Sequence, residues 1–242
     1  MKHIITVTSG KGGVGKTTTC INIAANLAKL GNRVLMIDGD IGMRNLDLSL
    51  GVQDCIVHNF IDVYRGNVSL PHAVVHVPNI ENLDLLSAPQ INYDENNLTK
   101  DVYMQICYKH AINYDYIIFD TPAGIGHAFE MATEPADLAL VVVTPDSASM
   151  RDADRAIGLI EDKTHPFLIV NRVRPKMIKK GKMMNVYEVV EGLGIDIIGI
   201  IPEDDKVLEK SLVLDYKKSK ANKAFSNISK RISGEVVPLI KL

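Results

Sequence analysis

A run of glycines and lysines near the amino terminus has the residue types and spacing needed to hold a chain of phosphates. It fits the pattern G-x-x-x-x-G-K-[ST] from Gly10 to Thr17, in which glycines let successive backbone N–H groups face phosphate oxygens. We expect Lys16 to contact the β- and γ-phosphates of a nucleotide and the Thr17 hydroxyl to contact Mg²⁺. The predicted nucleotide-binding residues of this loop are Gly10, Lys11, Gly12, Gly13, Val14, Gly15, Lys16, Thr17 and Thr18.

The segments on either side of the loop supply the structural context that this pattern requires. The apolar run at residues 4–7 predicts a buried strand, and residues 19–28 predict a helix. The amino end of that helix adds positive potential beside the loop. A glycine-rich turn without a ligand is the alternative, and the full match between a strand and a helix disfavours it.

Acidic residues end two of the predicted strands. Asp38 and Asp40 lie at the end of one apolar strand, and Asp120 ends another at residues 116–120. In a parallel sheet such ends face the ligand crevice, where a carboxylate can bind metal-bound water or orient an attacking water. Acids that only cap a loop or face solvent are the alternative at these positions.

A second lysine inside the phosphate loop narrows the class of protein. Lys11 lies close to Lys16, so the two charges repel unless Lys11 also faces phosphate or a neighbouring subunit. The loop resembles the K-G-G-x-G-K-[ST] loop of the deviant Walker A ATPases, the ParA/MinD family. That resemblance implies an ATP-dependent homodimer in which Lys11 reaches the nucleotide of the partner subunit.

Two further segments resemble the MinD branch of this family. Residues 38–47 resemble its D-x-D-I-G-x-R-N-L-D segment (switch I), and residues 120–125 resemble its D-x-P-A-G-I segment (switch II). By this resemblance Asp40 aligns the attacking water, Asp38 supports Mg²⁺ or dimer contacts, and Asp120 binds Mg²⁺ through water. With ATP and Mg²⁺ as cofactors, the expected catalytic residues are Lys11, Lys16 and Asp40, and the expected metal-binding residues are Thr17, Asp38 and Asp120.

The centre of switch II is expected at Pro122, Ala123 and Gly124, where the Gly124 N–H would sense the γ-phosphate. The family often has an acid after the isoleucine, whereas this chain has Gly126 and His127. This departure concerns partner contacts and leaves the chemistry unchanged. We expect His127 to be a solvated residue at a helix start rather than a base, because phosphoryl transfer does not need one.

Two strand ends in the second half of the chain are candidates for binding the nucleotide base. Asn171 ends an apolar strand, and Pro202 follows another at residues 195–201. By the family resemblance, Asn171, Arg172 and the Pro202 loop contact adenine, whereas a hydrogen-bonded turn is the alternative for Asn171. The sequence contains no N-K-x-D guanine motif, so ATP is favoured over GTP.

Two segments are candidates for contacts with regulatory proteins: switch I, and a stretch that resembles the R-D-x-D-R helix of the MinD branch. The candidate residues are Arg44, Asn45, Asp47, Arg151, Asp152 and Asp154. The resemblance implies partners of the MinC, MinE and MinJ type, which are division inhibitors and topological regulators. An exposed helix is the alternative for residues 151–155.

The basic residues between positions 172 and 182 are interpreted as a solvated loop. The alternative is that they contact anionic lipid or a partner protein.

The composition is that of a soluble globular protein. The 242 residues are 46% hydrophobic and 23% charged, and we expect a single domain over residues 1–242. The net charge of −2 gives no global positive field, so nucleic-acid binding is not expected. The three isolated cysteines argue against a zinc or iron–sulfur site and fit a reducing, cytoplasmic environment.

Short β-branched runs alternate with helical patterns, which predicts an α/β fold: a doubly wound, mostly parallel sheet with helices on both faces. We expect strands at residues 3–8, 33–38, 83–87, 116–120, 138–143, 167–171 and 195–201. We expect helices at residues 17–30, 98–112, 147–160, 185–191 and 220–232. Residues 59–97 are the least regular stretch and are expected to form surface connections.

The family resemblance extends from residue 2 to about residue 239. Its members usually continue with a basic amphipathic helix that binds the membrane, whereas the sequence given ends at Leu242. Such a tail is absent from the sequence given, which leaves open whether it is natively absent or was trimmed. We expect the chain without it to be cytoplasmic, with peripheral binding to the inner membrane where a tail is restored. The apolar face of the last predicted helix is expected to pack on the sheet. That face contains Ala221, Ala224, Phe225, Ile228 and Ile232.

The resemblance implies an ATP-hydrolysing dimerisation switch that positions the bacterial cell-division site. A flagellar-number ATPase and a chromosome- or plasmid-partition ATPase of the same superfamily are the alternatives. An iron–sulfur carrier is disfavoured because the cysteines are isolated.

Overall fold

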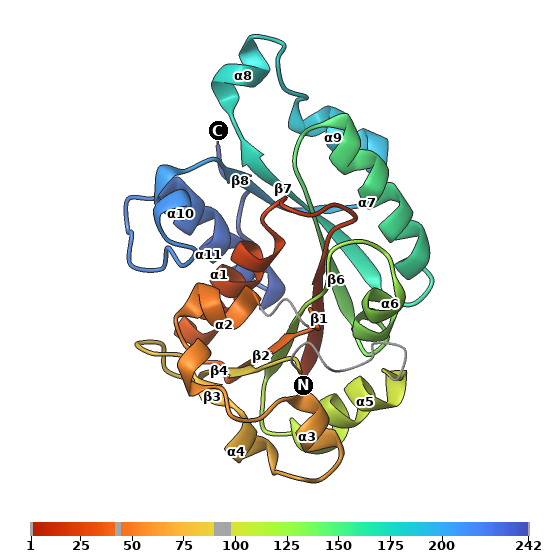
Figure 1. Cartoon of the computed structure of the whole chain (residues 1–242). Coiled ribbons are helices and arrows are strands. Elements are labelled where there is room, and N and C mark those ends of the chain that lie inside the picture. The colour runs from red at the N-terminus through yellow and green to blue at the C-terminus, as the bar shows by residue number, and fades with distance from the viewer. Residues whose placement is uncertain (1, 42–44, 90–97, 242) are drawn as a thin grey trace.

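An eight-stranded sheet forms the centre of the molecule, and helices cover both of its faces (Figure 1). The computed structural model describes residues 2–41, 45–89 and 98–241. Within these ranges the strand order is β3-β4-β2-β5-β1-β6-β7-β8, and all pairings are parallel except β3 with β4. The predicted doubly wound, mostly parallel α/β fold is confirmed.

The strands are β1 (His3–Thr8), β2 (Val34–Asp38), β3 (Val75–His76), β4 (Leu83–Leu86), β5 (Tyr116–Asp120), β6 (Leu138–Val143), β7 (His165–Val173) and β8 (Ile197–Pro202). The helices are α1 (Lys16–Lys29), α2 (Asn45–Leu50), α3 (Phe60–Tyr64), α4 (Leu70–Ala73), α5 (Lys100–Gln105), α6 (His127–Thr133), α7 (Ser147–Ile160), α8 (Pro175–Lys179), α9 (Val186–Leu193), α10 (Asp205–Glu209) and α11 (Lys220–Ile232). A 3₁₀ turn, η1 (Gln53–Cys55), and a π-helical turn, η3 (Ile106–His110), complete the described elements.

Alternation along the buried strands divides the core into two layers. In β1, Ile5 and Val7 face the layer that contains α1 and α11, whereas Ile4 faces the layer that contains α3, α5 and α6. Helices α7 and α9 cover the same second face beside β6 and β7. Because each strand is covered on both faces, its residues are almost wholly apolar, as in other parallel sheets.

Parallel pairing brings the carboxyl ends of seven strands to one edge of the sheet. The register pairs Asp38 at the end of β2 with Asp120 at the end of β5, and pairs Asp120 with Val7 of β1. The loop after β1, which contains the glycine pattern, therefore begins beside Asp120, and Asp38 lies one strand further along the sheet. This edge is where ligands bind in doubly wound folds.

The expectation that residues 59–97 form surface connections is wrong for residues 60–73. Asn59 and Asp62 form a reciprocal capping box that begins α3, and the Phe60 side chain is fully buried in the second core layer. Leu70 of α4 is also buried. Helices this short have only about one turn, so their apolar residues do not recur often enough to reveal a helical period in the sequence.

Other boundaries differ from the predicted ones by a few residues. The predicted helix at residues 98–112 is α5 followed by the π-helical turn η3, and β7 extends on both sides of residues 167–171. In α11, Ala221, Ala224, Phe225 and Ile228 are buried against α1 and β8, so the expected packing of this face is confirmed. Within the described ranges, every helix is too short or too polar to cross a lipid bilayer.

Candidate functional site

The phosphate loop is anchored at its centre and open at its end. Val14 is 2% exposed and packs in the core, between two glycines with left-handed backbone angles, Gly13 at φ 79° and Gly15 at φ 93°. Helix α1 begins directly after Gly15, which provides no side-chain cap. The first N–H groups of α1 therefore lack a capping side chain, and an anion can accept from them.

Asp120 holds the two side chains predicted to contact phosphate and metal. The Lys16 Nζ donates to Asp120 Oδ1 at 2.6 Å, and the Thr17 hydroxyl donates to Asp120 Oδ2 at 2.6 Å. The side chains of Lys16 and Asp120 are 10% and 2% exposed, so this ion pair is shielded from solvent. The structure thus brings together Lys16, Thr17 and Asp120, as the sequence predicted.

Asp38 lies beside this ion pair and is almost fully buried. Burial raises the pKa of Asp38 to about 7, with a further increase from the charge of Asp120, while N–H bonds from Asp40 and Leu46 lower it. Two neighbouring buried carboxylates repel each other unless a proton or a cation lies close by. Mg²⁺ prefers a site with one or two carboxylates completed by phosphate oxygens, so Thr17, Asp38 and Asp120 fit this ion.

Switch I and switch II touch directly behind these acids. The Gly39 N–H donates to the Asp120 carbonyl oxygen at 2.9 Å, and a Cβ at Gly39 would lie 3.0 Å from that oxygen. In switch II, Ala123 is exposed, Pro122 and Gly124 are half-buried, and Gly124 has φ 90°. The two switches are therefore in direct contact through backbone atoms.

The switch I residues differ in their exposure. Asn45 Nδ2 donates to Asp40 Oδ2 at 3.3 Å, so Asp40 is oriented by the first residue of α2. The prediction that Asp47 lies on a partner surface is wrong. Asp47 is 3% exposed, and its Oδ1 accepts from the Leu48 N–H. The first turn of α2 places Leu46 and Asp47 inward. Arg44, also predicted for a partner surface, lies outside the described residues.

Lys11 contacts the start of α7. Its Nζ lies 3.4 Å from Asp146 Oδ1, and the two side chains are 40% and 46% exposed. Asp146 also accepts from the Ser149 N–H and the Thr144 hydroxyl, so it caps α7. The sequence analysis did not single out Asp146, although an aspartate before a helical pattern is an N-cap signal.

The predicted partner residues of α7 lie on its outer side. Arg151 and Asp154 are exposed and Asp152 is half-buried, whereas Ala153 between them faces the core. His127 is exposed at the first position of α6, as expected, but its Nε2 lies 2.7 Å from the Leu98 carbonyl oxygen rather than facing only solvent. We find no contact of His127 with the described residues of the phosphate loop.

The predicted base-binding residues lie together beside the loop. Asn171, Arg172 and Pro202 line a cavity of about 60 Å³ that Gly15 and Leu208 also border. Small-molecule sites usually measure roughly 300–1,000 Å³, so this cavity by itself is smaller than the usual range; it shares Arg172 and Glu203 with a neighbouring cavity of about 470 Å³.

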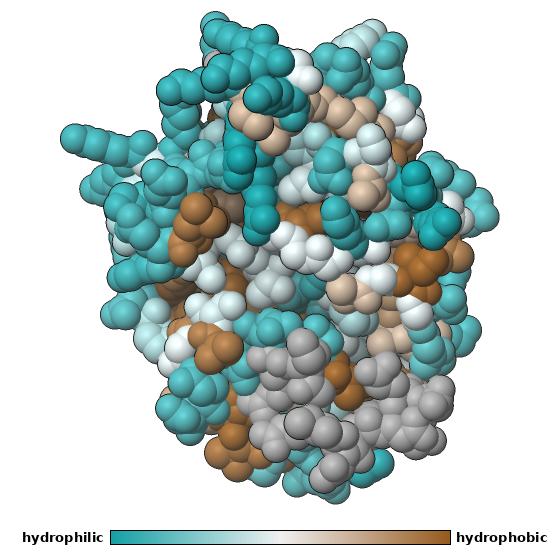
Figure 2. All heavy atoms as spheres, turned by 45° about the horizontal axis from the view of Figure 1, so that its top comes forward, coloured by the Kyte–Doolittle hydropathy of each residue, from teal (hydrophilic) through white to brown (hydrophobic). Residues whose placement is uncertain are grey.

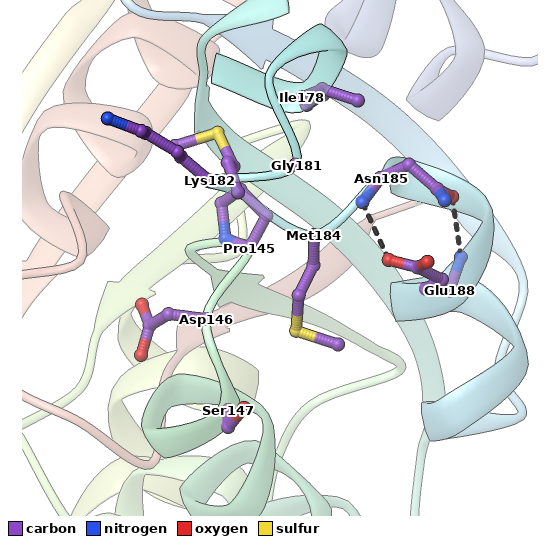
Figure 3. Close-up of a pocket in the computed structure, with 10 residues that line it drawn as sticks. Pro145, Asp146, Ser147, Ile178, Gly181, Lys182, Met184, Asn185 and Glu188 are labelled. Carbon is purple, nitrogen blue, oxygen red and sulfur yellow. Dashed lines mark hydrogen bonds between the residues drawn. The ribbon is translucent and has the colours of Figure 1, made fainter.

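Two larger cavities lie on the outer side of the phosphate loop. One, of about 470 Å³, is lined by Lys11, Arg172, Arg174 and Lys182 together with Asp146 and Glu203. The other, of about 440 Å³, lies between the start of α7 and the segment from α8 to α9. Figure 3 shows the Met184 side chain beside the capping box of Asn185 and Glu188, whereas the Asp146 carboxylate points away from that box. Part of the basic segment interpreted as a solvated loop thus borders the nucleotide site.

The surface around these cavities is mainly polar. Figure 2 shows hydrophilic side chains over most of the upper part of this face, with the hydrophobic ones scattered among them. Scattered apolar side chains are normal on a protein surface and do not by themselves mark a binding site.

The sheet, the glycine loop and the acids at the strand ends define a P-loop nucleotide-binding protein. The chain belongs to the CobQ/CobB/MinD/ParA nucleotide-binding domain family, whose profile matches residues 5–213. It is 45% identical over 249 residues to a putative septum site-determining protein MinD of Emiliania huxleyi, an alignment that covers 99% of this chain and 90% of that protein. The resemblance to the MinD branch is confirmed.

Solved structures agree with this assignment. The chain is similar to a chain of the MinC:MinD cell division protein complex of Aquifex aeolicus, with a TM-score of 0.87, 43% identity, and coverage of 99% of this chain and 98% of that chain. It is also similar to the septum site-determining protein MinD of Pyrococcus horikoshii complexed with Mg-ADP, with a TM-score of 0.81, 28% identity and 96% coverage of both chains.

Proposed function

We propose that this protein is a Mg²⁺-dependent ATPase that acts as a dimerisation switch in the placement of the bacterial cell-division site. The observation that carries the proposal is the group formed by Lys16, Thr17 and Asp120, with Asp38 beside it, at the mouth of a complete phosphate loop. The full-length similarity to septum site-determining MinD proteins supports the cellular role.

Each residue has a task that follows from its position. Lys16 would contact the phosphates of the nucleotide, and Mg²⁺ would supply the positive charge that Asp120 loses when Lys16 turns to those phosphates. Thr17 and the carboxylates of Asp38 and Asp120 would hold the ion, with water between the acids and the metal. Asp40, oriented by Asn45, would align the attacking water.

The active form in this proposal is an ATP-bound homodimer of a single domain spanning residues 1–242. Lys11 would leave Asp146 and reach the nucleotide of the partner subunit. Division inhibitors of the MinC type would bind the dimer, and regulators of the MinE or MinJ type would control hydrolysis. A Pyrococcus relative with Mg-ADP and an Aquifex relative in a MinC:MinD complex support the cofactor and the first partner.

We further propose a cytoplasmic protein that binds the inner membrane peripherally when it carries a membrane-targeting tail. A flagellar-number or partition ATPase of the same superfamily is the alternative function. The two roles differ in their partners, so co-purification with division regulators or with flagellar components distinguishes them.

The test of the biochemical proposal is the substitution Asp40→Ala. We expect ATP hydrolysis to fall by about 100-fold, because general acid–base and water-orienting groups contribute on this order. ATP binding by calorimetry should persist, since Asp40 orients water and does not contact phosphate. Light scattering with ATP and Mg²⁺ should show a dimer that lasts longer than that of the wild type.

The matched control is Asp162→Ala, which removes an exposed aspartate just beyond the end of α7. It should hydrolyse ATP at the wild-type rate. Wild-type turnover by Asp40→Ala would show that Asp40 does not align the water. Failure of the wild-type protein to bind ATP would reject the function as a whole.

A further inference from the structure

The side chain of Asn171 ties the end of β7 to the phosphate loop. Its Nδ2 donates to the Val14 carbonyl oxygen at 2.8 Å, and its Oδ1 accepts from the Arg172 backbone N–H at 2.8 Å. Asn171 is 7% exposed, so these bonds are shielded from competing water. The amide therefore joins two segments that are 157 residues apart in the chain.

The loop is shaped to receive this side chain. Gly15 has φ 93°, and a Cβ at this position would lie 2.4 Å from Asn171 Nδ2. On the other side of the same peptide, the Val14 side chain packs in the core. The Val14–Gly15 peptide is thus held by an apolar side chain, by a carbonyl hydrogen bond and by a close approach that only glycine allows.

Holding the Val14 carbonyl also fixes the direction of a donor. The Val14 C=O and the Gly15 N–H belong to one planar trans peptide, so they point in opposite directions. Since Asn171 binds the carbonyl, the Gly15 N–H points away from Asn171. The φ of Gly15, on one side of this peptide, has little conformational preference of its own, so the bond from Asn171 acts with the buried Val14 side chain to fix the direction of the N–H.

Asn171 is itself held in place by the turn that follows it. Arg172 has φ 55°, a left-handed conformation that is uncommon outside glycine. The bond from the Arg172 N–H to Asn171 Oδ1 stabilises this turn and orients the amide so that its nitrogen faces Val14. An amide nitrogen has two hydrogens, and Val14 accepts only one of them.

We infer that Asn171 is a positioning residue of the phosphate loop, so that binding of the phosphate chain, and not only of the base, depends on it. Asn171 borders the base cavity and holds the loop at the same time. This inference rests on the proposed nucleotide site and adds a direct physical link between its base and phosphate parts.

Inorganic tripolyphosphate with Mg²⁺ is the probe, because it has the phosphates of ATP and no base. Calorimetry compares the wild type with Asn171→Ala, which removes the donor to Val14 without adding charge, and with Asn171→Asp, which keeps the size and the acceptor for Arg172 but replaces the donor with a negative charge. We expect Asn171→Ala to lower tripolyphosphate affinity by about tenfold or more, since a buried carbonyl loses its partner. Asn171→Asp should have at least the same effect.

The control substitution is Leu208→Ala, which shortens a residue on the wall of the base cavity that is 70% exposed and makes no bond to the loop. It should lower the affinity for ATP and leave tripolyphosphate binding within about twofold. This contrast separates contact with the base from positioning of the loop.

Tripolyphosphate binding by Asn171→Ala within about twofold of the wild type, together with weaker ATP binding, would overturn the inference and leave the proposed function intact. A wild type that binds neither ligand would instead reject the proposed function. If the Asn171 variants fail to fold, NMR of the wild type tests the inference instead. We expect the signals of the Asn171 side-chain amide to shift when tripolyphosphate binds. Unchanged signals under saturating tripolyphosphate would contradict the inference.

Discussion

The acids Asp38 and Asp120 lie side by side in the interior, and their carboxylates have different hydrogen-bond partners. Asp120 accepts from Lys16 and Thr17, whereas Asp38 accepts only backbone N–H groups among the bonds described here. One carboxylate therefore has a cation beside it, and the pKa of the other is raised to about 7 by burial and by Asp120. This imbalance is what a bound divalent cation would correct.

The pKa of Asp38 predicts how stability changes with pH when nucleotide and Mg²⁺ are absent. Asp38 keeps its proton up to about pH 7 in the folded protein, whereas an unfolded aspartate loses it near pH 4. The folded state thus binds more protons in this interval, so its stability falls as pH rises, by about 4 kcal/mol in total. Asp38→Asn removes this dependence and should be more stable than the wild type at pH 8.

Thermal unfolding by circular dichroism at pH 5, 6, 7 and 8 checks this prediction. The difference in Tm between Asp38→Asn and the wild type should increase steadily with pH. Asp162→Asn, at an exposed site, should show no such trend. A pH-independent difference for Asp38→Asn would show that Asp38 is already ionised in the folded protein at pH 5.

Among the elements, the phosphate loop and α7 are in direct backbone contact. A Cβ at Gly10 would lie 1.9 Å from the Asp152 carbonyl oxygen and 2.8 Å from the Ala153 backbone nitrogen. Lys11, the next residue, contacts the Asp146 side chain that caps the same helix. A shift of α7 therefore moves the loop, and the outer face of α7 carries the predicted partner residues Arg151 and Asp154.

Gly10→Ala should disturb this contact because both neighbours are backbone atoms of a helix and cannot move aside like a flexible side chain. Overpacking of this kind costs about 1–3 kcal/mol, which corresponds to a decrease in Tm of roughly 3–10 °C for a chain of this size. ATP affinity should also fall, since the loop is displaced from α7.

Gly12→Ala is the matched control for stability, as a Cβ at Gly12 would meet its nearest neighbour, the Ala123 Cβ, at an ordinary 3.8 Å. Differential scanning calorimetry without nucleotide should give this variant a Tm close to that of the wild type. Equal Tm values for Gly10→Ala and Gly12→Ala would mean that α7 and the loop are not tightly packed in solution.

The elements that could be predicted from the sequence are those with several repeats of a pattern. Strand β5 and helix α11 begin and end at the predicted residues because an apolar strand or an amphipathic helix of this length repeats its pattern clearly. Strand β3 has two residues and depends on pairing with β4, so its own sequence holds no signal. The π-helical turn η3 lies within a stretch whose sequence pattern is continuously helical, so the pattern did not indicate it.

For the site, the sequence identified residues by type but not by contact. The glycine pattern predicted the loop, and strand-end acids predicted Asp38 and Asp120. The bond from Asn171 to Val14 joins residues far apart in the chain, so no local pattern could reveal it. The inward orientation of Asp47 was missed for a related reason, because burial of an acid depends on neighbours outside its own segment.

For the whole molecule, the parallel sheet gathers loops from distant parts of the chain at one open edge. The phosphate loop, the two switches and Asp146 lie at or just beyond the ends of β1, β2, β5 and β6, and Asn171 lies near the end of β7. They lie together because these five strands are parallel and adjacent. Lys11 is half-exposed at this edge beside a cavity of about 470 Å³. A site open on this side is suited to completion by a second copy of the chain.

Lys11→Ala tests whether the ATP-bound form is the proposed dimer. The pair of Lys11 and Asp146 is long and exposed, and such pairs contribute about 0–1 kcal/mol, so Lys11 can leave Asp146 at little cost. We expect the variant to fold with a Tm within about 3 °C of the wild type and to bind ATP, but to remain monomeric. Light scattering on a sizing column, with Mg²⁺ and a slowly hydrolysed ATP analogue, measures the mass.

The control is Lys29→Ala, which removes an exposed lysine at the end of α1 and should dimerise like the wild type. A Lys11→Ala dimer of wild-type stability would show that Lys11 stays with Asp146 and that the subunits assemble through other residues.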